Sequence, residues 1–355
     1  PEKGKLPKVK TIKDTMMYNM CLGFSELGHF VTLAIGEEFR PLEDEDYDFD
    51  VRFFKSSYTK FCPPTLLPYS VELKFFLKEH HEDFDLVISS EVFMFQSFFA
   101  ARICPNKTVI WHELALHQKK FCGIPSCLWY NVIARFFMNK VRCVIPRSID
   151  SYNFIRRYMP HVAREYVEHG INIDKFMPCR EKDNYVVYIG QLIERKNIPS
   201  LLRKFALYKK TDTSGLQLFL IGRGLLEMEL KTIVQELDID SYVKFVGFLN
   251  HDQLSNVLGK AKGMLIDTKQ DNNMVSIPES IVSGTPVLTN KIPTNACTIE
   301  KYKLGIAKKE WGVDDIRELI DKNLYYIENC ITFREKLSNK HQASLLIDLA
   351  LRSFV

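Results

Sequence analysis

The stretch GMLIDTKQDNNMVSIPESIVSGTPVLTN (263–290) contains the features that decide the fold of this chain. It opens with a short apolar run that ends at Thr268, which is typical of a buried strand. After a polar loop, Ser276-Ile277-Pro278-Glu279 has the spacing of a capping box with Pro in the first turn, and this predicts the start of a helix. We expect that helix to stop at Gly284, before a second strand at 285–290. Such a strand–loop–helix–strand unit indicates a parallel α/β sheet.

The same alternation of short apolar runs and amphipathic stretches extends through the chain, and it predicts two doubly wound, Rossmann-like α/β domains. Strands are expected at 30–36, 50–57, 85–90, 107–113, 142–148 and 164–170, and then at 184–190, 216–222, 242–247, 263–268 and 285–290. Helices are expected at 13–28, 71–82, 92–103, 126–140 and 149–158, and then at 198–209, 224–237, 251–261 and 278–283.

The length of 355 residues exceeds the usual size of a single hydrophobic core, so two domains are expected. The polar, strand-free segment 179–184 reads as a linker and predicts domains at 1–178 and 179–355, facing a central cleft. We expect the last helix to pack back on the first domain. The first domain opens with a basic loop and a helix, so either its first strand is missing before Pro1 or its sheet has one strand fewer.

Composition excludes several classes of protein. With 46% hydrophobic and 26% charged residues, the chain is not expected to be largely disordered. The 48 basic and 44 acidic residues are too balanced to indicate nucleic-acid binding, although the net charge of +4 is compatible with anionic membranes or phosphorylated substrates. Nine dispersed cysteines without CxxC argue against zinc or disulfides and favour a reducing cytoplasm. Neither a signal peptide nor a membrane-spanning helix is expected.

Two segments carry the residue types of an anion-binding site. The amide groups at the start of the helix near Ser276 favour an anion. Glu279 fits there if it faces a neutral group such as ribose hydroxyls; alternatively, it only caps the helix. In YIGQLIERKNIPSLLRKF (188–205), Arg195-Lys196 stand between a strand and a helix. These cations would neutralise a diphosphate, unless they form only a solvated basic turn.

Taken in order, these segments resemble the nucleotide-sugar domain of the group 1 (family 4) glycosyltransferases, which have the GT-B fold. The runs that carry the resemblance are HGINIDKF (169–176), YIGQLIERKNIPSLL (188–202), LFLIGRG (218–224), VKFVGFL (243–249) and the loop and helix at 271–287. A looser resemblance in the first half rests on LGHFVTL (27–33), the strand into Trp111-His112-Glu113, and CVIPRS (143–148). The resemblance implies an acceptor-side first domain and a nucleotide-sugar-binding second domain.

The resemblance also implies roles for the residues after the strand near 268. The family's two acids, eight residues apart, fall on Asp271, which would contact the transferred sugar, and on Glu279, which would hold the ribose. Asp271 stands where the family usually has Glu. The backbone amides of Met274, Val275 and Ser276 would face phosphate and sugar, and Met274 stands where the family usually has Gly.

Other roles follow from the resemblance in the same way. Gly190 ends the strand, Gln191 replaces the family's Arg, and Lys196 keeps its Lys, so Arg195 is expected to compensate for the lost charge. His112 aligns with the histidine that approaches the donor sugar, although a histidine at a strand end is often only a structural hydrogen bonder. A further correspondence places Gly4 in the family's glycine-rich loop near the phosphates.

The implied function is a retaining, metal-independent hexosyltransferase with His112, Asp271 and Lys196 as catalytic residues. A nucleotide-diphosphate sugar would be the co-substrate, with no cofactor, and a glycan or lipid-linked molecule the acceptor, in surface polysaccharide or glycoconjugate synthesis. The DxD spacings of the acidic run at 43–50 are expected to form a solvated loop and not a metal site. The alternatives are another GT-B enzyme, such as a nucleotide-sugar epimerase or a phosphorylase, and a non-catalytic nucleotide-sugar- or glycan-binding module.

One further stretch bears on location. CGIPSCLWYNVIARFFMNKVR (122–142) is aromatic, and it is basic at one end. It would either touch a membrane that carries a lipid-linked acceptor or form a buried amphipathic helix of the first domain. The sequence therefore predicts a cytoplasmic protein that is compatible with peripheral contact at the inner face of the membrane.

Overall fold

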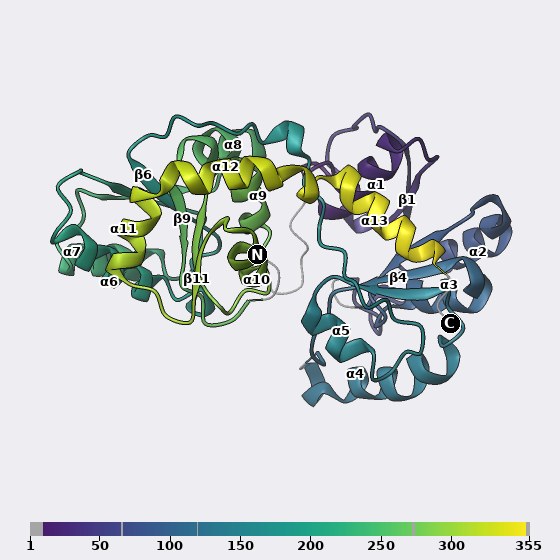
Figure 1. The fold of residues 1–355 in the computed structure, drawn as a ribbon. Helices are drawn as coiled ribbons and strands as arrows, with labels where there is room; N and C mark the ends of the chain where they lie inside the picture. The colour runs from purple at the N-terminus through teal and green to yellow at the C-terminus, as the bar shows by residue number, and fades with distance from the viewer. Residues whose placement is uncertain (1–9, 65–66, 119, 272–273, 353–355) are drawn as a thin grey trace. The chain divides into compact units, whose positions relative to one another are not determined.

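The computed structural model describes residues 10–64, 67–118, 120–271 and 274–352, and Figure 1 shows their fold. Contacts within the chain group it into two units, one of Pro1–Gly170 with Asn339–Val355, and one of Ile171–Ser338. The division falls at 170/171, where the sequence suggested 178/179, because Ile171 and Phe176 are buried in the core of the second unit. In the described part of the chain, no helix is both long and apolar enough to cross a membrane.

Unit 1 contains two parallel sheets in its described residues. β1 (Thr32–Gly36) pairs with β2 (Asp50–Phe54), and a second sheet has the order β3-β4-β5, formed by β3 (Val87–Ser90), β4 (Thr108–His112) and β5 (Cys143–Pro146). Its helices are α1 (Met16–Glu26), α2 (Val71–His80), α3 (Phe95–Ile103), α4 (Ile124–Leu128), which continues into the π-helix η5 (Trp129–Phe137), α5 (Ile149–Ile155) and α13 (Asn339–Leu351). Short 3₁₀ turns occupy Glu37–Phe39, His81–Asp83, Pro105–Lys107 and Lys120–Gly123.

The strand predicted at 164–170 is wrong. This segment touches the edge of β5 at separate points, where the Ala163 amide donates to the Val144 carbonyl and the Val167 amide donates to the Pro146 carbonyl, both at 2.9 Å. These bonds satisfy the backbone of an extended segment without building a continuous ladder. Val167 is buried all the same, as is Ala163 just before the segment, and this local burial resembles that of a strand.

Unit 2 has one sheet of six parallel strands in the order β11-β10-β9-β6-β7-β8. The strands are β6 (Tyr185–Ile189), β7 (Gln217–Ile221), β8 (Val243–Gly247), β9 (Gly263–Ile266), β10 (Val287–Asn290) and β11 (Gly305–Lys308). The helices are α6 (Ile198–Lys209), α7 (Glu227–Glu236), α8 (His251–Lys260), α9 (Ser276–Val282), α10 (Ala296–Tyr302), α11 (Val313–Asp321) and α12 (Asn323–Phe333), with 3₁₀ turns at Ile173–Lys175, Glu194–Lys196 and Arg334–Leu337. The strand order reverses between β6 and β9, and the loops that leave such a reversal are where ligands of doubly wound sheets bind.

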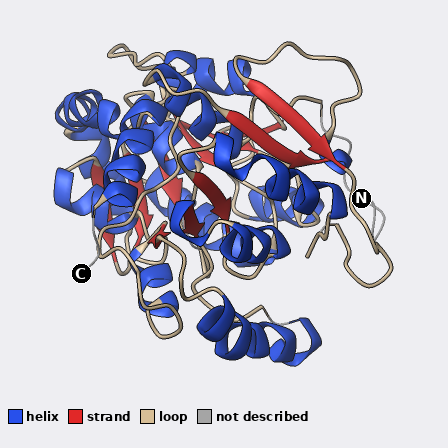
Figure 2. Ribbon diagram, turned by 90° about the vertical axis from the view of Figure 1, so that its right-hand side faces the viewer, coloured by secondary structure: helices blue, strands red, loops and turns tan. Residues whose placement is uncertain are grey.

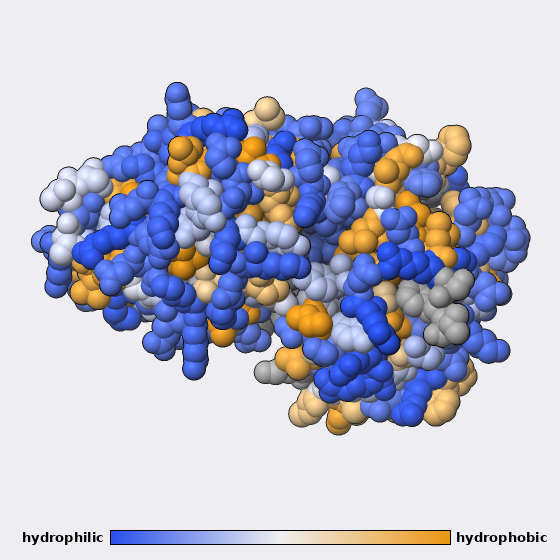
Figure 3. Space-filling model, viewed as in Figure 1, coloured by the Kyte–Doolittle hydropathy of each residue, from blue (hydrophilic) through white to orange (hydrophobic). Residues whose placement is uncertain are grey.

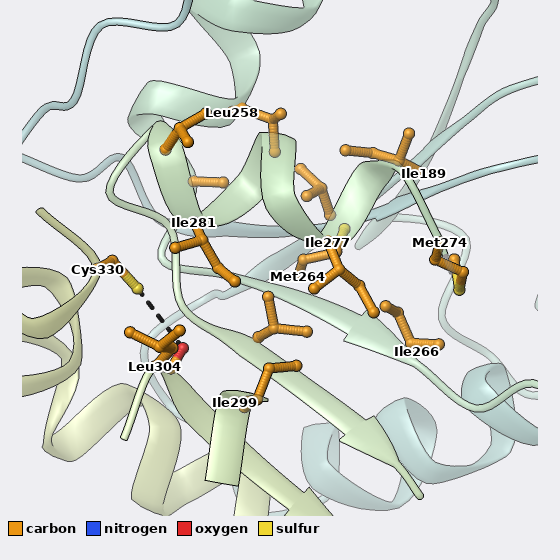
Figure 4. Packing of buried hydrophobic residues seen from close by; sticks show 14 of the residues in the cluster. Ile189, Leu258, Met264, Ile266, Met274, Ile277, Ile281, Ile299, Leu304 and Cys330 are labelled. Atoms are coloured by element: carbon orange, nitrogen blue, oxygen red, sulfur yellow. Dashed lines mark hydrogen bonds between the residues drawn. The ribbon is translucent and has the colours of Figure 1, made fainter. Parts of the chain in front are cut away.

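Both faces of the unit 2 sheet are buried. Along β6, Val187 and Ile189 pack into one apolar cluster, whereas Val186 and Tyr188 pack into another on the opposite face. Figure 4 shows the first of these clusters from close by, and Figure 2 shows the strands and helices of the chain from a second side. Burial on both sides explains why this strand is apolar without alternation, which is typical of parallel sheets.

The C-terminal helix α13 belongs to unit 1, where it packs along α1 (Figure 1). Ala343 and Leu346 of α13 share a buried cluster with Met20 and Phe24 of α1. The start of α13 lies so close to α1 that a Cβ atom on Gly23 would come within 2.4 Å of the Asn339 carbonyl oxygen. A glycine is therefore required at this contact.

Candidate functional site

The loops after β6 and β9 meet at the carboxyl edge of the unit 2 sheet. The Thr268 hydroxyl and the Lys269 amide both donate to the Arg195 carbonyl, each at 2.9 Å. In return, Nη1 of Arg195 donates to the Gln270 carbonyl at 3.2 Å. These bonds hold the two loops together at the point where the strand order reverses.

Three of the predicted site residues lie together in this place. Lys196 donates from Nζ to the carboxylate of Asp271, and Nη1 of Arg195 lies 3.4 Å from the same carboxylate. The side chains of Lys196 and Asp271 are 8% and 11% exposed, so the pair is largely withdrawn from water. Within this group of three side chains, two cations and one carboxylate give a net charge of +1. Such a surplus attracts an anion more strongly in a partly buried site than in open water.

Gly190 and Gln191 connect β6 to this loop. Gly190 has a φ of +154°, and a Cβ atom there would lie 2.9 Å from the Tyr188 hydroxyl. That hydroxyl donates to the Gln191 carbonyl at 3.1 Å, and the Gln191 side chain is exposed. A glycine is therefore required at position 190 by the backbone and by the nearby Tyr188 hydroxyl. The side chain of Gln191 is open to solvent beside the site.

The predicted capping box at the start of α9 is wrong. Ser276 is the first residue inside the helix, and Val275, which precedes it, has helical backbone angles (φ −59°, ψ −33°) and makes no side-chain cap. A side-chain cap requires an extended residue before the helix, with an oxygen that reaches the first free amides. The helix itself begins where the sequence predicted.

Met274 is anchored inside the protein. Its side chain packs among Ile266 and Ile277 in the cluster of Figure 4, and its amide donates to Oδ1 of Asn295 at 3.2 Å. That amide therefore has a protein acceptor, unlike the ligand-facing amide that the resemblance implied. Of its two neighbours, Val275 is exposed and Ser276 is partly exposed.

Glu279 lies on α9 with its side chain 9% exposed. One carboxylate oxygen, Oε1, is 3.6 Å from Nε2 of His251, the first residue of α8. Sequence reasoning did not single out His251, although a polar residue that opens the helix after β8 stands at the same sheet edge as the predicted site. Glu279 therefore already faces a polar neighbour next to the two tied loops.

The sequence also did not point to a polar cluster that lies at the start of the loop after β9. Asp267, directly after β9, accepts hydrogen bonds from the Ser200 hydroxyl at 2.6 Å and from the Lys204 ammonium at 2.8 Å. Asn290, at the end of β10, donates to the Thr268 carbonyl at 2.7 Å. Asp267 and Asn290 could have been found by their positions at the ends of parallel strands. They fix the start of the loop that carries Asp271.

His112 closes β4 in unit 1 and is fully buried. Its Nδ1 lies 3.0 Å from Oε2 of Glu91, and Nε2 has no hydrogen-bond partner among the described residues. The rings of Tyr130 and Phe154 lie near the imidazole, each with its centroid 6.1 Å away. The described contacts of His112 are thus all with its own unit.

A charged network that sequence analysis did not assign lies next to His112. The buried guanidinium of Arg147 donates to Glu113 and to the Ser90 hydroxyl, both at 2.9 Å, and lies 3.8 Å from the centre of the Trp111 ring. Nearby His169, together with Arg147, lowers the pKa of the Glu113 carboxyl to about 2 against the opposing effect of burial. Glu91, Glu113 and Arg147 each follow directly on one of three neighbouring strands, which is the signal that could have found them.

The remaining expectations concern Gly4 and metals. Gly4 lies outside the described residues. Within the ranges that are described, no group of three or more His, Cys, Asp and Glu side chains is placed to hold a metal ion. In the acidic run, the Asp48 carboxylate accepts a hydrogen bond from the Tyr18 hydroxyl at 2.5 Å.

Several known proteins are similar to parts of this chain. The family model "Glycosyl transferases group 1" matches residues 172–340, which is almost the whole of unit 2. The chain is 25% identical over 128 residues to the O-antigen chain mannosyltransferase RfbU of Salmonella typhimurium, covering 36% of this chain and 35% of that one. It is 36% identical over 70 residues, 20% of this chain and 18% of the other, to the N-acetylgalactosamine-N,N'-diacetylbacillosaminyl-diphospho-undecaprenol 4-alpha-N-acetylgalactosaminyltransferase of Campylobacter jejuni. The chain thus spans about a third or less of the length of these two curated relatives.

Solved structures resemble the whole chain. HepE (Alr3699) of Anabaena, crystallised with UDP, has a TM-score of 0.65 at 12% identity and is aligned over 96% of this chain and 97% of its own. WaaG, a glycosyltransferase involved in lipopolysaccharide biosynthesis, has a TM-score of 0.59 at 14% identity, over 98% and 97%. At such identities the likeness concerns the fold. Residues 172–340 thus match the model of the group 1 glycosyltransferases, and the fold of the chain is that of the GT-B glycosyltransferases.

Proposed function

We propose that this protein is a retaining, metal-independent glycosyltransferase that moves a sugar from a nucleoside diphosphate sugar to an acceptor hydroxyl. The observation that carries the proposal is the buried Lys196–Asp271 pair with Arg195 beside it, at the reversal of strand order in unit 2. One of the two cations, Lys196 and Arg195, balances the charge of the Asp271 carboxylate. The other is then available to attract a diphosphate, which must be bound and later released.

The chemistry that we propose uses these charges in the bond-breaking step. The bond between the anomeric carbon and the β-phosphate oxygen breaks, and negative charge grows on the leaving diphosphate. Lys196 and Arg195 stabilise this charge, and Asp271 contacts the transferred sugar. The acceptor oxygen bonds to the anomeric carbon on the face that the diphosphate leaves, and its proton passes to the leaving phosphate, so the configuration is retained. Preorganised charges of this kind are commonly the largest catalytic contribution.

The other site residues would hold the donor. We propose that Glu279 accepts hydrogen bonds from the ribose hydroxyls, because it is a nearly buried carboxylate beside the two tied loops. Val275 and Ser276 would turn their amides to the phosphates, while Met274 anchors the loop through its packing and Asn295. In unit 1, His112 would meet the donor sugar through Nε2.

We propose a glycan or lipid-linked acceptor, in surface polysaccharide or glycoconjugate synthesis. The names of the relatives support this class, since one acts on O-antigen chains and another on a diphospho-undecaprenol saccharide. Because the HepE crystal holds UDP, UDP and UDP-sugars are the first probes to use. We expect neither a cofactor nor a nucleic-acid partner.

We also propose peripheral contact with the cytoplasmic face of a membrane. Ile124 and Leu128 of α4 and Phe136 of η5 are 60–67% exposed and recur at intervals of four or eight residues. We name these three residues the α4 stripe. Exposed Arg135 and Lys140 lie near its end, and Figure 3 shows apolar side chains at the surface over α4. An apolar row with adjacent cations suits an anionic lipid surface.

A binding and transfer assay tests the proposed reaction. A thermal-shift screen with UDP, GDP, ADP and their sugars identifies the nucleotide, because a ligand that binds the native state raises its stability. Mass spectrometry then follows transfer from the matching sugar to glycan or lipid-linked acceptors. Donor consumption without an acceptor product would favour an epimerase or phosphorylase, and nucleotide binding without turnover would favour a binding module.

The variant Lys196→Gln tests the residue that carries the proposal. We expect kcat to fall by about 100- to 1,000-fold, with a much smaller change in the donor KM, because the charge acts mainly in the transition state. Lys196→Arg keeps the charge and should recover part of the activity. The control Lys291→Gln removes an exposed lysine that is paired with Glu300 and should leave kcat unchanged. Circular dichroism verifies the fold, because loss of one partner of a buried ion pair is destabilising. A folded Lys196→Gln variant with normal turnover rules out this role.

A further inference from the structure

We propose that Glu91 is a positioning residue that holds the proton of His112 on Nδ1 and leaves Nε2 to meet the substrate. This inference rests on the proposed function, since His112 is the imidazole that we place beside the donor sugar. It concerns a residue that neither the motifs of the sequence nor the comparisons assign.

The two carboxylate oxygens of Glu91 face different neighbours, and Oε2 also accepts a long bond of 3.4 Å from the Leu114 amide. Oε2 lies 3.0 Å from Nδ1 of His112, and Oε1 accepts the backbone amide of Glu113 at 2.7 Å. Burial by itself would raise the pKa of this carboxyl, but His112 and Arg147 outweigh it and lower the pKa below its usual value. An ionised carboxylate has no proton to donate, so the hydrogen between Glu91 and His112 must belong to Nδ1.

A second neighbour of Nδ1 competes with this assignment. The Val92 amide points its N–H at Nδ1 over 3.5 Å, the outer limit of a hydrogen bond, and Nδ1 could accept that bond only if it carried no proton. The carboxylate is closer by 0.5 Å and carries a charge, so it decides which ring nitrogen is protonated. Glu91 therefore sets the tautomer of His112.

The other ring nitrogen is the one that invites a ligand. Nε2 of His112 is buried, and among the described residues it has no hydrogen-bond partner. Buried polar atoms are nearly always hydrogen-bonded, so an orphaned one indicates a missing partner. With the proton fixed on Nδ1, a neutral ring offers a lone pair at Nε2, which suits a sugar hydroxyl as donor.

The backbone at Glu91 is strained in a way that supports a positioning role. Glu91 has a φ of +67°, in the left-handed region that side-chain-bearing residues avoid. Two bonds hold it there: its amide donates to the Trp111 carbonyl at 3.2 Å, and the Ser97 hydroxyl donates to its carbonyl at 2.5 Å. Strain that the surroundings maintain is typical of residues whose side chain must point in one direction.

The variant Glu91→Gln tests the inference with almost no change in shape. In the wild type, Oε1 accepts the Glu113 amide at 2.7 Å, and Oε2 faces the His112 ring at 3.0 Å and the Leu114 amide at the longer distance of 3.4 Å. The side-chain amide of glutamine has only one acceptor oxygen for these donors. The Glu113 amide cannot give up its proton, so the oxygen should remain there and the NH2 group should face Nδ1. Nδ1 must then accept, and the proton of the imidazole should move to Nε2.

Nitrogen-15 NMR of the histidine-labelled full chain reads this tautomer directly. A His112→Gln sample assigns the ring among the nine histidines. We expect a protonated Nδ1 in the wild type and a protonated Nε2 with an unprotonated Nδ1 in Glu91→Gln. Glu113→Gln is the matched control, because the Glu113 side chain pairs with Arg147 and its change to an amide should leave the His112 tautomer as in the wild type.

The outcomes separate this inference from the proposed function. An unprotonated Nδ1 in the wild type overturns the inference, and this holds even if Glu91→Gln does not fold. A folded Glu91→Gln variant in which the His112 tautomer is the same as in the wild type also overturns the inference. For sugar transfer we expect kcat to fall by about 10- to 100-fold in Glu91→Gln, with the donor KM within about twofold; a switched tautomer with full turnover refutes the positioning role. If the wild type transfers no sugar, the proposed function fails, while the spectra still decide the Glu91–His112 bond.

Discussion

The buried carboxylate of Glu279 has either a structural role or a role in binding the ribose. Its neighbour His251 offers a structural partner, whereas a ribose would offer two hydroxyl donors. We expect Glu279→Gln to weaken binding of the nucleotide found by thermal shift by about 1.5–3 kcal/mol, which is about 10- to 150-fold in Kd. The reason is that hydrogen bonds to a charged acceptor are stronger than those to an amide. Isothermal titration calorimetry provides the measurement.

The change His251→Gln separates the two explanations. It removes the imidazole that lies 3.6 Å from Glu279 and keeps the carboxylate itself. Nucleotide affinity close to that of the wild type is expected if Glu279 binds the ribose directly. If instead Glu279→Gln binds the nucleotide as tightly as the wild type does, the carboxylate is structural.

Asp212 links one residue of unit 2 to stability at different pH values. Its side chain is buried against Lys209, and it accepts bonds from the Ser214 amide and hydroxyl. Burial would raise the pKa of Asp212, but Lys209 and Ser214 outweigh it and lower the pKa from 3.8 to about 2. Because the pKa is lower in the folded state, the stabilisation is complete above pH 3.8 and is lost as the pH falls towards 2.

We therefore expect Asp212→Asn to lower the free energy of unfolding by about 2 kcal/mol at neutral pH, with the difference shrinking below about pH 4. Urea unfolding followed by circular dichroism at stepped pH provides the test. The exposed Asp240→Asn change is the control and should produce no such pH-dependent difference. A destabilisation that stays constant down to about pH 3 would contradict the ion-pair explanation.

At the scale of elements, α4 and η5 form a helix with two apolar sides. Trp129 and Tyr130 are buried in the core of unit 1, while the α4 stripe (Ile124, Leu128 and Phe136) is exposed. A core helix needs only the first side, so the second is the one available to a lipid surface. The basic residues near its end give the contact its preference for anionic lipids.

We expect the double change Leu128→Glu and Phe136→Glu to reduce binding to phosphatidylglycerol vesicles by at least about tenfold, because each side chain would otherwise bury apolar area worth about 1.5–3 kcal/mol. Vesicle co-sedimentation measures the effect, and phosphatidylcholine vesicles show how much of the binding depends on charge. Leu207→Glu, at an exposed leucine of α6 in unit 2, is the matched control. Equal sedimentation of the double variant and the wild type would exclude the α4 stripe as a docking surface.

At the scale of the whole molecule, the chain leaves unit 1 at Gly170 and returns to it at Asn339. The fully buried Leu346 of α13 completes an apolar cluster with residues of α1, β4 and β5. The apolar core of unit 1 is thus complete only when α13, the last helix of the chain, has packed against it. Unit 2, in contrast, is formed by one continuous segment.

We expect Leu346→Ala to destabilise unit 1 by about 2–5 kcal/mol, the usual cost of a leucine-sized cavity, without changing unit 2. Hydrogen exchange read by mass spectrometry resolves this, since peptides of β4 and β5 should lose protection while those of β6 and β7 keep it. The exposed Leu351→Ala change serves as the control. Equal loss of protection in both units would show that they unfold as one body.

Much of this architecture could be read from local pattern. The helix predicted at 198–209 is α6 (Ile198–Lys209), and the strands of unit 2 up to 290 lie where short apolar runs predicted them. Two local readings failed. The segment 164–170 buries Val167 but is not a strand, and Ser276 has the spacing of a cap without the backbone that a cap needs. The pattern indicated the burial of Val167 and the start of α9 correctly. It contained no information on the backbone hydrogen bonds that define a strand or a cap.

The sequence by itself determined most of the strands and helices up to residue 290, the two-domain plan and the cations and acids on the loops of unit 2, because periodicity and turn chemistry act over a few residues. Only the tertiary structure decided which of these residues meet. It brought the Asp271 carboxylate against the Lys196 ammonium and bound the Met274 amide to Asn295. It also set Glu91 against His112, since neighbouring strands bring to one edge residues that lie far apart in the chain. Such contacts depend on strand order, which no local stretch of sequence contains.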